Sequence, residues 1–169
     1  MPEKPEAATL DWATVGHEFA FDGAWRDIYV VGTTASDGTR LLRALSLSNY
    51  PLSYTRAGVQ VELPEEAAAA FPSAGECDRL LSIDVAGVQM IAHFFAESEI
   101  EFDMDPREIT AQARLDAALD FMRFLSRCLN KDVILTPENS RGEVNLSRPT
   151  ERRPGGVSAR APVNDVRDD

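Results

Sequence analysis

Two tight-turn signals constrain the fold of this chain more than any other feature of its sequence. The tetrapeptide Ala-Gly-Val-Gln occurs at residues 57–60 and again at residues 86–89, and each copy separates two runs whose composition favours β-strands. Glycine readily adopts the positive φ that a two-residue hairpin turn requires. Two successive hairpins interrupt the strand–helix–strand rhythm of a doubly wound parallel fold, so we expect a mainly antiparallel sheet.

The remaining elements follow from residue type and apolar spacing. Strands are predicted at residues 25–31, 52–56, 59–63, 80–85, 88–95, 97–104 and 133–136. A short helix is expected over Arg40–Leu47, with Asp37 as its N-cap, and a second short helix opens at Pro64. The long helix covers residues 106–129, where apolar side chains recur every three or four positions. The predicted fold class is α+β, with a mainly antiparallel sheet of about six strands and one long and two short helices packed on one face.

Composition at the two ends sets the domain boundaries. Residues 1–10 are polar and contain proline, and residues 141–169 contain proline and glycine but no aromatic residue. Such segments bury too little apolar surface to offset the entropy of ordering them. We therefore expect a disordered N-terminus, a single α+β domain over residues 11–140 and a disordered Arg/Pro/Gly-containing tail. The chain has 17 basic and 28 acidic residues, a net charge of −11, and its acidic excess lies in the predicted domain.

Charge and cysteine content argue against several classes of protein. Binding of nucleic acid through phosphate contacts needs clustered Lys and Arg, whereas the pI here is about 4.6. No stretch is long and apolar enough to span a membrane, and the first residues lack the features of a signal peptide. Cys77 and Cys128 are too few for a disulfide framework and match no metal-ligand spacing. We expect a cytoplasmic, bacterial-type protein with reduced thiols, without nucleic-acid or membrane partners.

The sequence contains no recognisable catalytic or phosphate-binding motif. It has neither a nucleophile elbow nor a glycine-rich phosphate loop, and its two histidines, His17 and His93, lie far apart. We predict no catalytic residue, no cofactor and no metal ligand, so an enzyme is the less favoured class. The oligomeric state does not follow from the sequence. His93 is expected inside a strand, and Glu138 could extend any acidic surface.

One charge pattern points to a function. Residues 97–105 carry acidic side chains at every second position, with apolar side chains between most of them. Side chains on a strand alternate between its two faces, so the apolar residues are expected to face the core while carboxylates about 6.6 Å apart face the other way. The predicted row consists of Glu97, Glu99, Glu101 and Asp103. Asp105 is left out because we expect it to cap the long helix, in a capping box with Glu108.

Several interpretations of this row are open. It could be a solvated face that protects an edge strand from edge-to-edge pairing, a surface for a basic protein partner, a divalent-cation site or a paired-carboxylate hydrolase site. An interface between copies would bury unpaired carboxylates at high cost. We favour a non-enzymatic acidic domain that uses the row to bind a basic protein partner, as an immunity or antitoxin protein would. The alternative is a small metal-dependent hydrolase using Glu99, Glu101 and Asp103.

Overall fold

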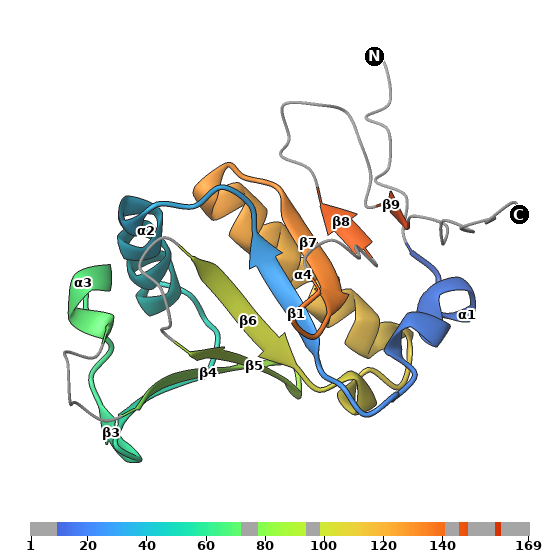
Figure 1. The fold of residues 1–169 in the computed structure, drawn as a ribbon, viewed down its shortest axis with the longest axis horizontal. Helices are drawn as coiled ribbons and strands as arrows, with labels where there is room; N and C mark the ends of the chain where they lie inside the picture. Colours follow the sequence, from blue (N-terminus) through green and yellow to red (C-terminus); the bar gives the residue numbers. More distant parts are fainter. Residues whose placement is uncertain (1–9, 72–77, 94–98, 141–145, 149–157, 160–169) are drawn as a thin grey trace, which may run out of the picture.

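Antiparallel strands and helices make up the regular structure of the described residues in similar proportions (Figure 1). The computed structural model describes residues 10–71, 78–93, 99–140, 146–148 and 158–159. Its strands are β1 Arg26–Val30, β2 Leu52–Arg56, β3 Val59–Val61, β4 Arg79–Val85, β5 Val88–His93, β6 Ile100–Met104, β7 Val133–Pro137, β8 Leu146–Arg148 and β9 Ser158–Ala159. Its helices are α1 Trp12–Val15, α2 Ala35–Ser46, α3 Ala67–Ala70 and α4 Gln112–Leu129, with 3-10 turns at Gly16–Phe19 and Pro106–Glu108.

The described strands form one sheet in the order β3-β2-β4-β5-β6-β1-β7-β8-β9. Each pair of neighbouring strands is antiparallel. The α+β fold class predicted from the sequence is therefore confirmed. The order of elements from β1 to β7 also follows the prediction, while α1, β8 and β9 are additional short elements.

Both Ala-Gly dipeptides form the tight turns that the sequence predicted. Ala57 and Gly58 have φ of 51° and 74°, and Ala86 and Gly87 have φ of 52° and 84°. Positive φ at both central residues is the signature of a type I′ turn, whose twist matches that of the flanking strands. The shared tetrapeptide is thus explained by shared turn chemistry.

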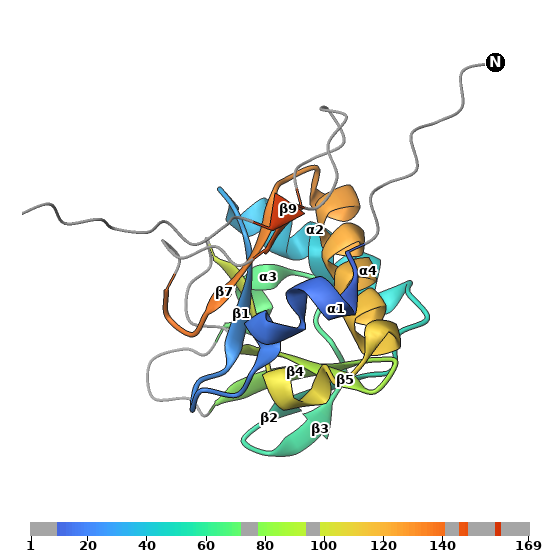
Figure 2. The same cartoon turned by 90° about the vertical axis from the view of Figure 1, so that its right-hand side faces the viewer.

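All of the described helices pack on the same side of the sheet. Buried residues of α1, α2, α3 and α4 belong to a single apolar core together with the inward residues of the strands. The ring of Phe102 on β6 meets that of Phe121 on α4 edge to face, with centroids 5.1 Å apart. Figure 2 shows the helices gathered on one side of the bent sheet. We call the opposite side of β5, β6, β1 and β7 the helix-free face.

The predicted long helix is interrupted near its start, so the proposed capping box is wrong. Asp105 caps only the 3-10 turn, where its Oδ1 accepts a hydrogen bond from the Arg107 backbone N–H at 2.9 Å. Glu108 does not reach back to Asp105, because its Oε2 accepts the Gln89 backbone N–H at 2.7 Å. The α-helix then begins at Gln112 and ends as expected at Asn130, whose φ of 54° is left-handed. None of the described helices is long and apolar enough to cross a membrane.

The predicted disordered ends lie largely outside the described residues. Only Leu10, β8 and β9 of residues 1–10 and 141–169 are described, and β8 and β9 continue the sheet beyond β7. Cys77 also lies outside the described residues. Cys128 is a partly buried free thiol, and burial raises its pKa.

Helix α2 begins earlier than predicted, with Thr34 rather than Asp37 as its N-cap residue. Asp37 sits in the first turn and is only 5% exposed. Its Oδ2 accepts hydrogen bonds from the backbone N–H and the hydroxyl of Thr34, both at 2.9 Å, and lies 3.5 Å from Lys131 Nζ. Burial acts to raise the pKa of Asp37, but the Thr34 hydrogen bonds and the nearby positive charges lower it from its ordinary value of 3.8.

Replacing Asp37 by asparagine is expected to lower the free energy of unfolding by about 1–2 kcal/mol at neutral pH, because the capping hydrogen bonds lose their charge. A lowered folded-state pKa stabilises the fold above the unfolded-state pKa, and this contribution disappears as the pH falls through the folded-state pKa. The gap between wild type and Asp37→Asn should therefore close in acid. Urea unfolding over a pH series checks this, and a gap independent of pH would show that the charge is not what stabilises α2.

Candidate functional site

The alternation predicted around residues 99–104 is present in the structure. Ile100, Phe102 and Met104 are buried in the core, whereas Glu101 and Asp103 are partly exposed on the helix-free face. Strand β6 lies between β5 and β1, so it is a central strand and the interpretation as edge protection is wrong. Of the predicted row, Glu97 lies outside the described residues, and Glu99 immediately precedes β6.

The β1–β6 pairing brings a third acidic residue to this face. Asp27 is directly opposite Asp103 and Tyr29 is opposite Glu101, and opposed residues in a sheet project from the same face. Asp27 is only 1% exposed. One carboxylate oxygen from each of Asp27, Glu101 and Asp103 lies within 4.8 Å of the other two. We call these three residues the carboxylate cluster; Glu99 is not part of it.

Among the described residues, few hydrogen-bond donors contact the carboxylate cluster. The Tyr29 hydroxyl lies 3.1 Å from Asp27 Oδ2 and 2.8 Å from Glu101 Oε1, although it has a single proton to donate. The Asn139 backbone N–H donates to Asp27 Oδ2 at 2.7 Å. Within the described part of the chain, no lysine or arginine forms an ion pair with the cluster. Its negative charge is therefore only weakly compensated.

A hollow on the helix-free face adjoins the cluster. It is lined by Trp25, Leu80, Ile91, His93, Asp103 and Glu138. His93 Nε2 lies 3.4 Å from Asp103 Oδ2, so this histidine does converge with the acidic side chains. Glu138 Oε2 accepts the Trp25 backbone N–H at 3.0 Å, which places a fourth carboxylate at the rim of the hollow. The prediction that Glu138 could extend the acidic surface agrees with this position.

Burial raises the pKa of all three carboxyls in the cluster. For Asp27 the hydrogen bonds from Asn139 and Tyr29 act against burial, but the pKa remains raised. For Glu101 the charges of Asp27 and Asp103 add to the effect of burial. For Asp103 the charge of Asp27 raises the pKa further and His93 lowers it. The cluster thus holds negative charge where it is unfavourable, a property that is frequent at binding and catalytic sites.

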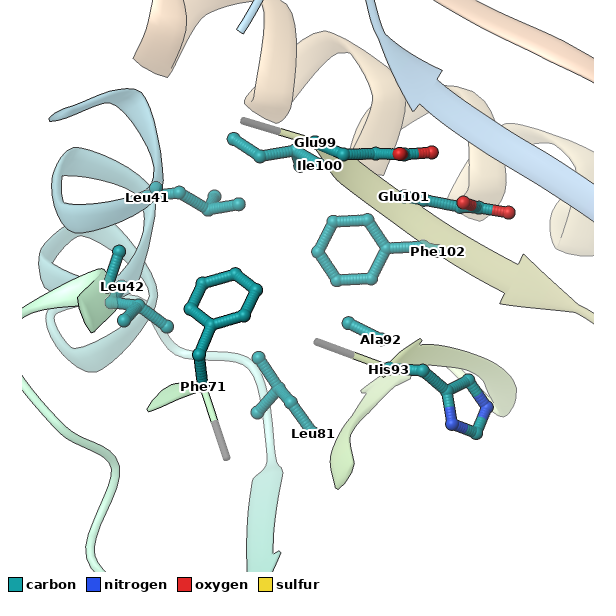
Figure 3. Close-up of a pocket in the computed structure, with 12 residues that line it drawn as sticks. Leu41, Leu42, Phe71, Leu81, Ala92, His93, Glu99, Ile100, Glu101 and Phe102 are labelled. Carbon is teal, nitrogen blue, oxygen red and sulfur yellow. The ribbon is translucent and has the colours of Figure 1, made fainter. Parts of the chain in front are cut away.

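A separate apolar pocket lies on the helix-covered side of β5 and β6 (Figure 3). Its apolar lining comes from α2, α3 and three strands, and includes Leu41, Leu42, Phe71, Leu81, Ala92, Ile100 and Phe102. Glu99, Glu101 and His93 border it, but Figure 3 shows their side chains pointing away from the apolar ones. The carboxylates of Glu99 and Glu101 therefore point away from the apolar interior of this pocket.

The sequence did not predict the contribution of Asp27 and Tyr29 to the site. Asp27 is one acidic residue within a run of strand-forming residues. A single acidic residue is common on the exposed face of a strand, so it does not by itself indicate a functional site. What makes Asp27 part of the site is its register with Asp103, which no local pattern specifies. Glu101 and Asp103 were predicted and are brought together, whereas their role in binding stays a prediction.

Comparison of the chain with protein-family models, with curated proteins and with solved structures finds no match. We therefore infer a function from the carboxylate cluster and the hollow beside it.

Replacing Asp27 by asparagine is expected to raise the free energy of unfolding by about 0.5–2 kcal/mol at neutral pH. The neutral amide removes a buried charge beside two others, and its oxygen can still accept the Asn139 and Tyr29 hydrogen bonds. Urea unfolding measures the change, with Glu62→Gln at an exposed position as the control. A less stable Asp27→Asn variant would show that the carboxylate charge at this position is favourable.

Proposed function

We propose that this chain is a non-enzymatic binding domain whose helix-free face docks a basic surface of another protein. The observation that carries the proposal is the carboxylate cluster, one buried and two partly buried acids with no lysine or arginine paired to them among the described residues. A cationic partner group would supply the compensation that the described residues do not. Such complementarity guides encounter and disfavours wrong partners.

Acidic residues elsewhere in the described chain differ from the carboxylate cluster in their pairing. Several of them have an arginine partner of their own, including Asp22 with Arg26, Glu66 with Arg43, Asp105 with Arg107 and Asp120 with Arg123. Ion pairs between an acidic residue and an arginine are therefore common among the described residues, whereas the carboxylate cluster on the helix-free face has none. Functional sites are where such departures are expected.

The hollow gives the face an apolar part beside its charges. Trp25, Leu80 and Ile91 supply apolar walls, and Asp103 and Glu138 supply carboxylates at the same hollow. An arginine side chain suits this combination, because its guanidinium pairs with carboxylates while its flat face and aliphatic stem pack on apolar and aromatic groups. Arginine and tryptophan are also the residue types that contribute most often to interface hot spots.

The net charge of −11 adds a long-range attraction toward basic partners. One concrete form of the proposal is an immunity or antitoxin protein that covers a basic toxin such as a nuclease. The alternative, a metal-dependent hydrolase using Glu99, Glu101 and Asp103, is less well supported. Its three residues are not the three whose oxygens converge, because Asp27 takes the place of Glu99 in the cluster.

The proposal is tested by comparing two double variants that change the net charge equally. Glu101→Gln with Asp103→Asn alters the cluster, whereas Glu62→Gln with Glu65→Gln alters exposed positions at the far side of the sheet. Partners retained from a lysate of the source organism are identified by mass spectrometry, and the strongest is purified. Its affinity for wild type and both variants is then measured at low and at physiological salt.

We expect a partner with a basic surface whose dissociation constant rises about tenfold or more for the cluster variant, since two charge pairs are lost. The control variant should bind within about twofold of wild type, because exposed charges away from an interface contribute little. Added salt should weaken the wild-type complex more than the cluster-variant complex. Equal binding of the purified partner to both variants would refute the proposed docking face.

A further inference from the structure

The oxygen positions in the carboxylate cluster suit a metal ion. Divalent cations such as Ca²⁺ and Mg²⁺ lie about 2.0–2.6 Å from their oxygen ligands, so two ligands on opposite sides of Ca²⁺ are about 4.8 Å apart. One oxygen from each of Asp27, Glu101 and Asp103 lies within 4.8 Å of the others. The three can therefore share one ion without movement of β1 or β6.

A buried hydroxyl beside the cluster provides a second, independent observation. Thr136 on β7 is opposite Asp27 on β1, and Asp27 is opposite Asp103 on β6, so the three side chains form one row across the helix-free face. Thr136 is 0% exposed, and among the residues that the structure describes its Oγ1 has no hydrogen-bond partner. Buried polar atoms are nearly always hydrogen-bonded. Thr136 stands next to a carboxylate and yet does not donate to it, which leaves its oxygen lone pairs available to a cation.

The surrounding hydrogen bonds resemble those that orient metal ligands. Tyr29 contacts both Asp27 and Glu101, and Asn139 donates to Asp27 through its backbone N–H. In known metal sites, such outer contacts fix the direction of the ligating carboxylates. They do not neutralise the cluster, because a phenolic hydroxyl and a backbone N–H carry no net charge.

We propose that Asp27, Glu101 and Asp103, together with the Thr136 hydroxyl, bind one divalent cation. Oxygen-only ligands favour Mg²⁺, Ca²⁺ or Mn²⁺ over softer ions. His93, 3.4 Å from Asp103 Oδ2, borders the site without being one of its four ligands. The proposal goes beyond the docking function and does not depend on it, because the site is complete within a single chain.

The test uses the purified full chain, freed of metal with a chelator and then exchanged into chelator-free buffer. Calorimetric titration and thermal unfolding are run with Mn²⁺, Mg²⁺ and Ca²⁺ separately, up to about 5 mM, since binding to the native state alone must raise the melting temperature. We expect at least one ion to bind with one-to-one stoichiometry and to raise the melting temperature. Glu101→Gln should weaken its affinity about tenfold or more, whereas Glu62→Gln should leave it unchanged.

Thr136→Val tests the site more specifically than Glu101→Gln, because valine has nearly the same shape as threonine and lacks only the hydroxyl. The hydroxyl has no hydrogen-bond partner within the described part of the chain, so its loss should not lower the melting temperature measured without added metal. It should nevertheless weaken cation binding several-fold, which a purely structural role of Thr136 would not do. Unchanged cation affinity in Thr136→Val would overturn the four-ligand site.

The whole proposal is overturned if none of the three ions gives a binding heat or a thermal shift with wild type. It is also overturned if the affinity is the same in Glu101→Gln and in wild type. Because no partner protein is present in these measurements, their failure would leave the docking proposal untouched. Failure of the partner experiment would likewise leave the cation site standing.

Discussion

The pairing of β1 with β6 is the constraint on which the core and the candidate site both depend. Its register sets Ile28 against Phe102 on the core side and Asp27 against Asp103 on the helix-free face. Because side chains alternate along a strand, a slip of one residue would exchange the two faces. Burying one large apolar side chain contributes about 1.5–3 kcal/mol, and a register slip would expose several of them. Their sum exceeds the roughly 3–4 kcal/mol of repulsion between two charges about 5 Å apart at an effective dielectric constant of about 20. Core packing therefore holds the acidic residues together.

The residues that stabilise the fold differ from those that form the candidate site. The apolar core and the arginine-paired acids of the described chain need no outside group. The carboxylate cluster differs from them, because burial raises the pKa of each of its members. For Glu101 and Asp103 the charges of neighbouring cluster carboxylates raise the pKa further. The proposed basic partner or divalent cation would supply positive charge at this position.

Local sequence patterns predicted most helices and strands correctly, but not which strands and side chains lie next to one another. Turn chemistry at the two Ala-Gly dipeptides and the alternation at 99–104 are short-range properties, and both are confirmed. The central position of β6 and the partnership of Tyr29 with Glu101, 72 residues apart, depend on pairing that no short window contains. The wrong capping box has the same cause. Glu108 has the expected residue type and spacing, but a backbone N–H from β5 engages its carboxylate.

A basic partner and a divalent cation would draw on the same negative charge, so their binding must be coupled. Thermodynamic linkage requires that the ion weakens partner binding by the same factor by which the partner weakens ion binding. The coupling should be incomplete, because Glu138 and the Trp25 wall lie in the hollow and outside the carboxylate cluster. With an ion in place, the face would keep its apolar hollow and one carboxylate while losing most of its charge. Cation concentration would then set how strongly this face attracts a basic partner, without any change in the fold.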